Sequence, residues 1–311
     1  MPLIWVLTGS KTGDNAQVLR AAQAIGLPFE VKRIVLKPGH ETAKPAVRPS
    51  LDIVDVAASD PFTAPWPDLV ITIGRRLSLP ALWIREQSGA KSRIALFNAP
   101  KGRAEDFALI IVPAHYTLAD GPRVCRIGLP LIAADPARIE AAGKERAAEF
   151  AALAQPVHVL LLGGDMGARK LDPAFATATF RTMQDSFAAS GSIYVSTSRR
   201  TPPAAADALE RILRPQDRLY RWREKADDNP YFALLAHGGT FTVTSDSLSM
   251  LTEVARLGRP PARDLGEAAG YLVRTGHAVR LGQALPAAAD PPDDDTARVA
   301  SRLRRMALGQ D

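Results

Sequence analysis

Cysteine is nearly absent from this sequence: Cys125 is the single cysteine among 311 residues. One thiol can form no internal disulfide and cannot build a zinc site from several cysteines, so the composition fits a reducing compartment. Cys125 lies in "RVCRIGLPL", among alternating apolar residues. A free cysteine in such a pattern behaves as a small buried hydrophobe.

Long apolar runs are lacking as well. No segment approaches the ~18 apolar residues of a membrane-spanning helix, and the longest runs, "VHVLLLGG" and "FALIIVP", have the length of buried strands. The N-terminal "MPLIWVLTGS" carries no basic leader and its apolar run is short, so it predicts a strand rather than a signal peptide. We therefore expect a cytoplasmic protein, peripheral at the inner membrane at most.

Aromatic residues make up only 6% of the chain, and they are not interleaved with basic residues as in RNA-reading surfaces. We therefore expect no nucleic-acid partner. The net charge is nevertheless +6, from 39 Lys and Arg against 33 Asp and Glu. Such an excess attracts the phosphates of nucleotides or of an anionic lipid surface.

Strand-like apolar runs and amphipathic helix patterns alternate along the chain, which is typical of doubly wound parallel sheets. The alternation is interrupted by "DPARIEAAGKERAAEFAALAQP" and restarts at "VHVLLLGG". Because 311 residues exceed one average core, we predict an α/β protein of two Rossmann-like domains, 1–145 and 146–311, facing a cleft. The amphipathic terminal helix 295–308 is a candidate to pack back on the N-terminal domain.

Three loops of the second half connect a predicted strand to a predicted helix, which is where open parallel sheets bind ligands. They carry two glycines, two arginines and a run of hydroxyls, a combination that predicts an anion or nucleotide site. Each loop alone has a simpler interpretation, as a capped helix or a surface arginine pair. The residues assigned to the nucleotide and its diphosphate are Gly163, Gly164, Ser198, Arg199, Arg200, Thr244, Ser245, Asp246, Ser247, Ser249 and Glu253.

Glu253 has a particular place in this set, because it lies within the helix pattern that begins at Ser247. A carboxylate one to two turns below a phosphate-binding helix start is suited to accept two hydrogen bonds from a ribose diol. The simpler interpretation is a helix with a good serine N-cap and a solvated glutamate on its surface.

The first loop of the N-terminal half, "TGSKTGDNAQ", is not a phosphate-binding P-loop, because Gly13 is followed by Asp14 instead of the required lysine. We interpret it as a loop that approaches the sugar and the acceptor, with Gly13 and Asn15 among the contacts. Asp14 is either a general base that deprotonates an acceptor hydroxyl or an N-cap of the following helix.

Other strand ends of the N-terminal half carry further candidates. Arg75 and Arg76 stand at a helix start that could hold an anion, although a solvated arginine pair is the simpler interpretation. Asn98 ends another strand and is assigned to a sugar or acceptor hydroxyl. His115 follows an apolar strand and is the second candidate base after Asp14, although a lone histidine is more often structural.

Several motifs together resemble a known family. "VTSDSLSMLTEVARLGRP" is similar to the donor-nucleotide segment of GT-B glycosyltransferases, and "GDNAQ", "DLVITIGRR", "TSRRTP" and "NPYFALLA" resemble the elongated-mitochondria fission-protein family. The resemblance implies a GT-B fold in which Ser245, Ser247 and Ser249 contact phosphate and Glu253 accepts from the ribose. It also implies that Arg199 and Arg200 neutralise the diphosphate. The chain departs from the family at Gly238-Gly239, where members usually carry Ala-Asp.

These observations predict a GT-B-type glycosyltransferase that transfers a sugar from a nucleotide-diphosphate sugar to an unknown acceptor, lipid-linked or part of an envelope glycan. Arginines and a helix dipole would replace a metal, so we expect no metal and no further cofactor. A nucleotide-sugar epimerase of the same fold and a non-catalytic fission-type adaptor are the alternatives. The base, the donor sugar, the acceptor and the stereochemical outcome stay open.

Overall fold

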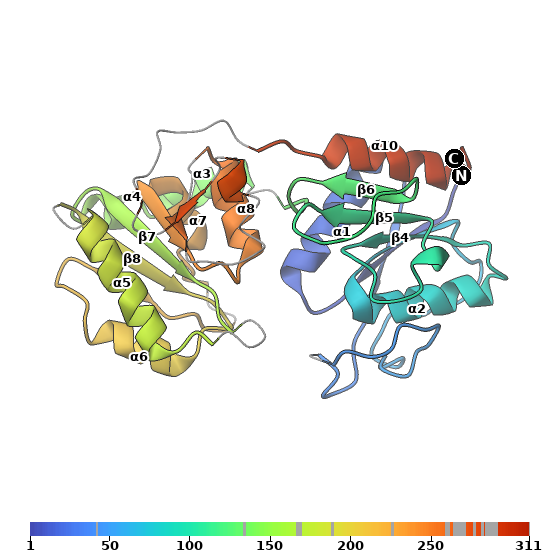
Figure 1. Ribbon diagram of the computed structural model, residues 1–311, viewed down its shortest axis with the longest axis horizontal. Helices are drawn as coiled ribbons and strands as arrows, with labels where there is room; N and C mark the ends of the chain where they lie inside the picture. The colour runs from blue at the N-terminus through green and yellow to red at the C-terminus, as the bar shows by residue number, and fades with distance from the viewer. Residues whose placement is uncertain are drawn as a thin grey trace. The chain divides into compact units, whose positions relative to one another are not determined.

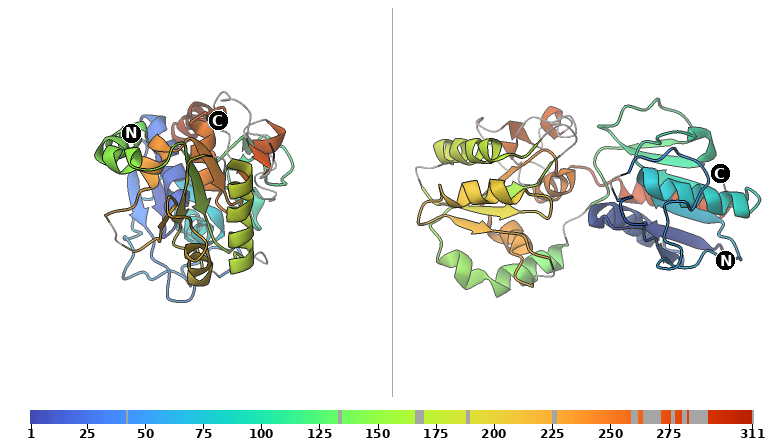
Figure 2. Two further views of the ribbon diagram at one scale, coloured as in Figure 1. Left: turned by 90° about the vertical axis from the view of Figure 1, so that its left-hand side faces the viewer. Right: turned by 90° about the horizontal axis from the view of Figure 1, so that it is seen from below.

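The computed structural model describes residues 1–41, 43–132, 135–165, 170–187, 190–224, 227–258, 262–263, 272–275, 278–280, 283 and 292–310. The chain divides into two compact units (Figure 1). Unit 1 comprises Met1–Ile132 and Asp293–Asp311, and unit 2 comprises Ala133–Pro292. Each unit contains one six-stranded, fully parallel sheet with helices beside it (Figure 2).

The sheet of unit 1 has the strand order β2-β1-β3-β4-β5-β6. Strands β1, β3 and β5 are buried along their whole length, as expected for Val- and Ile-rich strands covered on both faces. The elements are β1 (Ile4–Thr8), α1 (Thr12–Ile25), β2 (Glu30–Arg33), β3 (Leu69–Ile73), α2 (Gly74–Gln87), β4 (Arg93–Phe97), the 3-10 helix η1 (Ala104–Asp106), β5 (Leu109–Pro113), β6 (Val124–Ile127) and α10 (Thr296–Ala307).

The sheet of unit 2 has the order β12-β11-β10-β7-β8-β9. Its neighbouring interior strands β7 and β8 are completely buried. The elements are α3 (Pro136–Glu145), α4 (Ala147–Ala151), β7 (Val157–Leu162), α5 (Pro173–Phe187), β8 (Ser192–Thr197), α6 (Pro203–Glu210), β9 (Arg218–Tyr220), α7 (Tyr231–His237), β10 (Thr240–Val243), α8 (Leu248–Arg256), β11 (Ala262–Arg263) and β12 (Val279–Arg280).

The structural division differs from the predicted boundary at residue 145, because α3 belongs to unit 2. Helix α3 packs against α7, and the carbonyl of Gly143 lies 2.8 Å from Nε2 of His237. A side chain at Gly143 would collide with the Cβ of Ala236, 2.9 Å away, so the absence of a side chain permits this close helix contact. A sequence pattern shows that a helix exists but not which core it joins.

Helix α10 returns to unit 1 and packs against α1, which is the placement that the sequence offered as a candidate for the terminal helix 295–308. Its apolar face is buried through Val299, Leu303 and Met306. Arg304 donates to the carbonyl of Ile25, which is one of the unsatisfied carbonyls at the end of α1. Helix α10 therefore contributes apolar surface to the core and places the positive charge of Arg304 at the C-terminal end of α1.

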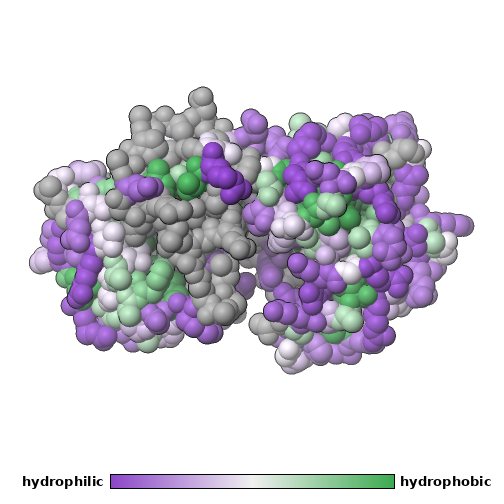
Figure 3. All heavy atoms as spheres, viewed as in Figure 1, coloured by the Kyte–Doolittle hydropathy of each residue, from purple (hydrophilic) through white to green (hydrophobic). Residues whose placement is uncertain are grey.

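The surface of unit 1 is mostly hydrophilic on the face that Figure 3 shows, with hydrophobic residues in small separate patches. Among the residues that the structure describes, no helix has the length and apolarity to span a membrane. Within the same residues, no group of three or more His, Cys, Asp or Glu side chains is arranged to hold a metal ion.

Candidate functional site

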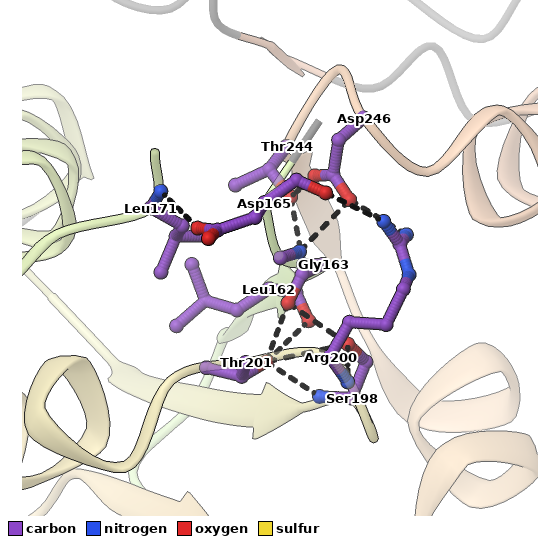
Figure 4. A network of polar contacts seen from close by, with 10 residues as sticks. Leu162, Gly163, Asp165, Leu171, Ser198, Arg200, Thr201, Thr244 and Asp246 are labelled. Atoms are coloured by element: carbon purple, nitrogen blue, oxygen red, sulfur yellow. Dashed lines mark hydrogen bonds and ion pairs between the residues drawn. The ribbon is translucent and has the colours of Figure 1, made fainter. Parts of the chain in front are cut away.

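Three loops of unit 2 meet at the carboxyl edge of its sheet (Figure 4). They follow β7, β8 and β10, and these strands are neighbours because β7 pairs with both of the others. Parallel strands bring their carboxyl ends to one edge, which explains why residues 40 to 80 positions apart in sequence come together. The glycines, arginines and hydroxyls predicted for a nucleotide site therefore do converge.

Asp246 lies at the centre of this convergence. Its carboxylate accepts hydrogen bonds from the Gly164 amide at 2.8 Å, the Thr244 hydroxyl at 2.6 Å and the Arg200 guanidinium at 2.7 Å. The Asp246 side chain is only 8% exposed. One of the glycine amides expected to bind a ligand therefore already has a carboxylate acceptor from the chain itself.

The two glycines are required by this close approach. A Cβ on Gly163 would lie 2.0 Å from a carboxylate oxygen of Asp246, and one on Gly164 would lie 2.2 Å from the carbonyl oxygen of Arg200. The Gly163 amide donates to the Thr244 hydroxyl at 2.7 Å. The sequence analysis expected these glycines to permit a close approach to a ligand, whereas the groups that approach them in the structure are Asp246 and Arg200 of the protein itself.

The loop after β8 is hydrogen-bonded to the same glycine segment. The hydroxyls of Ser198 and Thr201 both donate to the carbonyl of Gly163, at 2.8 and 2.5 Å. Arg200 is engaged with Asp246, whereas Arg199 is exposed and makes no ion pair with any residue that the structure describes. Of the predicted arginine pair, Arg199 is therefore the one whose charge is not neutralised by a described carboxylate.

The serines at the start of α8 do not serve as helix caps. Ser247 occupies the N-cap position but makes no side-chain cap bond, and Ser249 is half-buried within the first turn. Within the described part of the chain, no acceptor is found for the backbone N–H groups of residues 248–250. The first turn of α8 thus combines hydroxyls with unpaired amides, which is the arrangement that binds anions.

Glu253 is not a solvated surface glutamate. It is half-buried and accepts a 2.5 Å hydrogen bond from the hydroxyl of Tyr231 at the start of α7. Burial raises the pKa of Glu253, opposed by the Tyr231 hydrogen bond and by the positive charge of Arg138. Burial and the adjacent carboxylate raise the pKa of Tyr231 well above its usual value of 10. The carboxylate is therefore held in a fixed orientation.

Tyr231 is a functional candidate that the sequence analysis missed. The available signal was its position in the motif "NPYFALLA", directly after a proline at the start of a helix. Nothing in the spacing of that motif shows that the hydroxyl reaches a glutamate 22 residues away in the next helix.

Unit 1 contains a pocket of about 540 Å³ at the carboxyl ends of β1, β3 and β4. It brings together five of the residues predicted for the sugar, the acceptor or the proton transfer: Asp14, Asn15, Arg75, Arg76 and Asn98. Gly13 and His115 do not line it, although the neighbouring Tyr116 does. The predicted acceptor residues are thus mostly gathered in one cavity.

Two of these residues have roles that differ from a simple ligand contact. The side-chain amide of Asn15 is committed to the backbone, because Oδ1 accepts from the Gly9 amide at 2.9 Å and Nδ2 donates to the Gly9 carbonyl at 2.7 Å. Asp14 lies within the first turn of α1, and the N-cap position belongs to Lys11. Asp14 is therefore not the N-cap that the sequence left as its alternative.

Asp14 and His115 have the properties of very different bases. Burial raises the pKa of Asp14, against the opposing charges of Lys11 and Arg76. Burial lowers the pKa of His115 to about 4, and its ring lies 4.4 Å from that of Tyr116. An imidazole with a pKa of about 4 is a weak base at neutral pH. Asp14 lines the pocket and His115 does not, so the geometry favours Asp14 as the candidate base.

The two parallel, doubly wound sheets and the loops at their carboxyl edges define a GT-B-like fold. UDP-GlcNAc 2-epimerase from Methanocaldococcus jannaschii, in complex with UDP-GlcNAc and UDP, matches with a TM-score of 0.57 at 12% identity, covering 97% of this chain and 99% of that chain. The enzyme of the same name from Neisseria meningitidis, bound to UDP-GlcNAc, has a TM-score of 0.51 at 11% identity, covering 99% and 94%.

Sequence comparison then identifies the family. The model of the family described as mitochondrial fission ELM1 matches residues 12–307, and the chain belongs to this family. The mitochondrial fission protein ELM1 of Arabidopsis thaliana is 26% identical over 216 residues, which cover 62% of this chain and 50% of that protein. The match to this curated relative therefore spans half of its length. The resemblance that the motifs indicated is confirmed.

Proposed function

We propose that this protein transfers a sugar from a nucleotide-diphosphate sugar to an acceptor, and that unit 2 binds the donor. The observation that carries the proposal is the first turn of α8. Its hydroxyls and unpaired amides lie one to two turns from a carboxylate that Tyr231 holds in place. The phosphates of the donor would bind at the start of the helix, and the ribose diol would bind to Glu253 further along it.

Arg199 is suited to neutralise the leaving diphosphate together with the positive end of α8. The proposed reaction needs no metal and no further cofactor for this purpose, since cationic and dipolar groups can supply the same charge stabilisation. The solved structures of the same fold also contain nucleotide ligands, UDP-GlcNAc and UDP, which supports a nucleotide sugar as the partner here. The excess of basic residues would suit an acceptor at the inner membrane surface, where the cytoplasmic protein would bind peripherally.

Asp14 is the proposed proton acceptor. In the transfer step, the acceptor hydroxyl oxygen forms a bond to C1 of the sugar, and its proton moves to the Asp14 carboxylate. The bond from C1 to the diphosphate oxygen breaks, and its electron pair leaves with the nucleoside diphosphate. The raised pKa of Asp14 favours this proton transfer.

A nucleotide-sugar epimerase is the second candidate, because the two solved structures compared above are epimerases with nucleotide ligands. Epimerisation by elimination and re-addition needs more than one acid or base around the sugar ring. Among the described residues that line the pocket of unit 1, Asp14 and Glu41 are the carboxylates, and Glu41 is exposed. This favours transfer over epimerisation.

Calorimetry with the full chain and a panel of nucleoside diphosphates and nucleotide sugars tests the proposal. We expect one base to bind, and Glu253→Ala to weaken it at least tenfold. Glu140→Ala is the matched control, because Glu140 lies in unit 2 and its side chain is 67% exposed. A ligand at 100 times its dissociation constant adds about 2.7 kcal/mol of stability, which gives an independent thermal readout.

The outcomes separate the three functions. Binding by wild type that Glu253→Ala loses and Glu140→Ala keeps supports the nucleotide site. NMR of the donor incubated without an acceptor would reveal an epimer if the second candidate is correct. A folded protein that binds no nucleotide would refute both enzymes and leave the adaptor.

A further inference from the structure

The pocket of unit 1 has an unusual charge. Its cationic side chains come from the loop after β1, the segment before residue 48, the start of α2 and the loop after β4: Lys11, Lys44, Arg75, Arg76 and Lys101. The described lining contributes only two carboxylates, Asp14 and Glu41. Five cations against two acids around one cavity make a strongly positive potential, because the low-dielectric walls focus the field.

Few of these cations are neutralised by the protein. Lys11 lies 3.8 Å from Asp14, and Arg75 donates to the carbonyl of Lys44 at 3.1 Å. For Lys44, Arg76 and Lys101, no carboxylate lies within ion-pair distance among the residues that the structure describes. The Lys101 ammonium instead lies 5.8 Å from the centre of the Tyr116 ring. Three cations that form no ion pair within the described residues therefore border one cavity, and Asp14 is the carboxylate whose charge acts on Arg76.

The start of α2 adds to this potential. The helix begins at Gly74, its first turn carries no acidic residue, and the N-cap Ile73 can offer no side-chain acceptor. Residues 73–77 all line the pocket. Arginines at a helix N-terminus oppose the helix dipole, so this arrangement is unfavourable unless an anion occupies the site. The amides of the first turn and the two arginines would then bind the same anion.

We infer that this pocket binds a phosphate-bearing molecule, with the phosphate among Arg76, Lys101 and the first turn of α2. That this molecule is the acceptor rests on the proposed function, with Asp14 adjacent to take the proton from its hydroxyl. Anion binding itself does not rest on it. The phosphate can belong to a lipid headgroup or to a water-soluble phosphate ester, and both present the same charged group to the pocket.

Two probes distinguish these sources with the full-length chain. Glycerol 3-phosphate in calorimetry represents a soluble ester. Sedimentation with phosphatidylcholine vesicles containing one-fifth phosphatidic acid, compared with pure phosphatidylcholine, represents a lipid phosphate. The test variant is Arg76→Gln with Lys101→Gln, which removes two charges and keeps the side chains long and polar.

The matched control is Arg85→Gln with Lys91→Gln, which changes the net charge equally. Both positions lie at or beyond the last turn of α2, and Arg85 is separated from Arg76 by roughly 14 Å along the helix axis. We expect the pocket variant to weaken binding of at least one probe tenfold or more and the control to retain it. Circular dichroism verifies that both variants are folded.

Several results would overturn the inference. Equal weakening in the control would show attraction by net charge alone, and no binding of either probe by the wild type would refute a phosphate site. Loss of glycerol 3-phosphate binding in Glu253→Ala would assign the anion to the donor instead of the acceptor. Retained probe binding in a protein that binds no nucleotide would leave the phosphate pocket standing while the proposed transferase fails.

Discussion

Replacing Tyr231 with phenylalanine isolates the contact that orients Glu253. The substitution removes one hydroxyl and leaves the ring, which lies 5.5 Å from that of Phe232. Glu253 then remains buried, with the charge of Arg138 as the other influence that lowers its pKa. Since the lost bond was 2.5 Å long and made to a carboxylate, its removal leaves a desolvated charge without its donor.

The expected cost follows from that geometry. A hydrogen bond to a charged group contributes about 1.5–3 kcal/mol, so we expect the free energy of unfolding at pH 8 to fall by about 2 kcal/mol. In a unit of this size that lowers the melting temperature by roughly 4–8 °C. Nucleotide affinity should fall as well, because the carboxylate loses its fixed orientation towards the ribose.

The loss should depend on pH in a definite direction. The pKa of Glu253 in the folded protein is raised above the usual value of 4.5, so the native state binds more protons than the unfolded state and stability falls as pH rises above about 4.5. Losing the Tyr231 bond raises that pKa further. The variant should therefore be more strongly destabilised at pH 8 than at pH 4.5, where more than half of the Glu253 carboxyl groups are protonated.

Urea denaturation at the two pH values measures this, with Tyr194→Phe as the control. The Tyr194 hydroxyl donates at 3.2 Å to Glu149, whose side chain is 42% exposed and also pairs with Arg146. Solvent can replace that bond, so the control should lose about 1 kcal/mol or less. If Tyr231→Phe lowers the free energy of unfolding by no more than this control at either pH, the stabilisation of the Glu253 carboxylate by Tyr231 is refuted.

Three further changes test other parts of the structure. Gly164→Ala should lower the free energy of unfolding by about 1–3 kcal/mol or more in denaturant, because the new Cβ would lie 2.2 Å from the carbonyl oxygen of Arg200. Gly239→Ala is the control and should be tolerated, because the nearest atom to its Cβ would be 3.4 Å away. His115 has a pKa of about 4 in the folded protein against 6.5 in the unfolded chain. Its contribution to the free energy of unfolding should therefore fall by up to about 3 kcal/mol as the pH falls from 6.5 to 4. A pH titration of stability should lose this contribution in His115→Gln. Leu303→Ala in α10, where the leucine is fully buried, should cost about 2–5 kcal/mol, and an unchanged melting curve would contradict the packing of α10 on unit 1.

The loops of the site could be located in advance because strand ends are visible in the sequence. Gly163, Arg200 and Ser245 each come shortly after a segment that the sequence predicts as a strand, and parallel strands place such ends on one edge. What no pattern shows is which groups face each other there. Asp246 was assigned to a ligand, but its carboxylate neutralises Arg200 and accepts from a glycine amide. That pairing depends on the strand register.

The simpler interpretations of the opening turn of α8 fail for the same reason. A serine before a helix usually caps it and a glutamate in its second turn is usually solvated, and both expectations are statistical statements about isolated helices. In the folded chain the Ser247 side chain makes no cap bond, and α7 brings Tyr231 against Glu253. The environment of a helix face is set by the helix beside it, which sequence spacing does not reveal.

The sequence by itself determined the class of this protein. The alternation of buried strands and amphipathic helices fixes a parallel α/β architecture, since only sheets covered on both faces require such continuous apolar strands. Tertiary structure alone decided that α3 belongs to unit 2, that Arg200 has an ion-pair partner while Arg199 has none among the described residues, and that five cations share one pocket. These outcomes depend on contacts between segments far apart in the chain, and long-range contacts leave no period in the sequence.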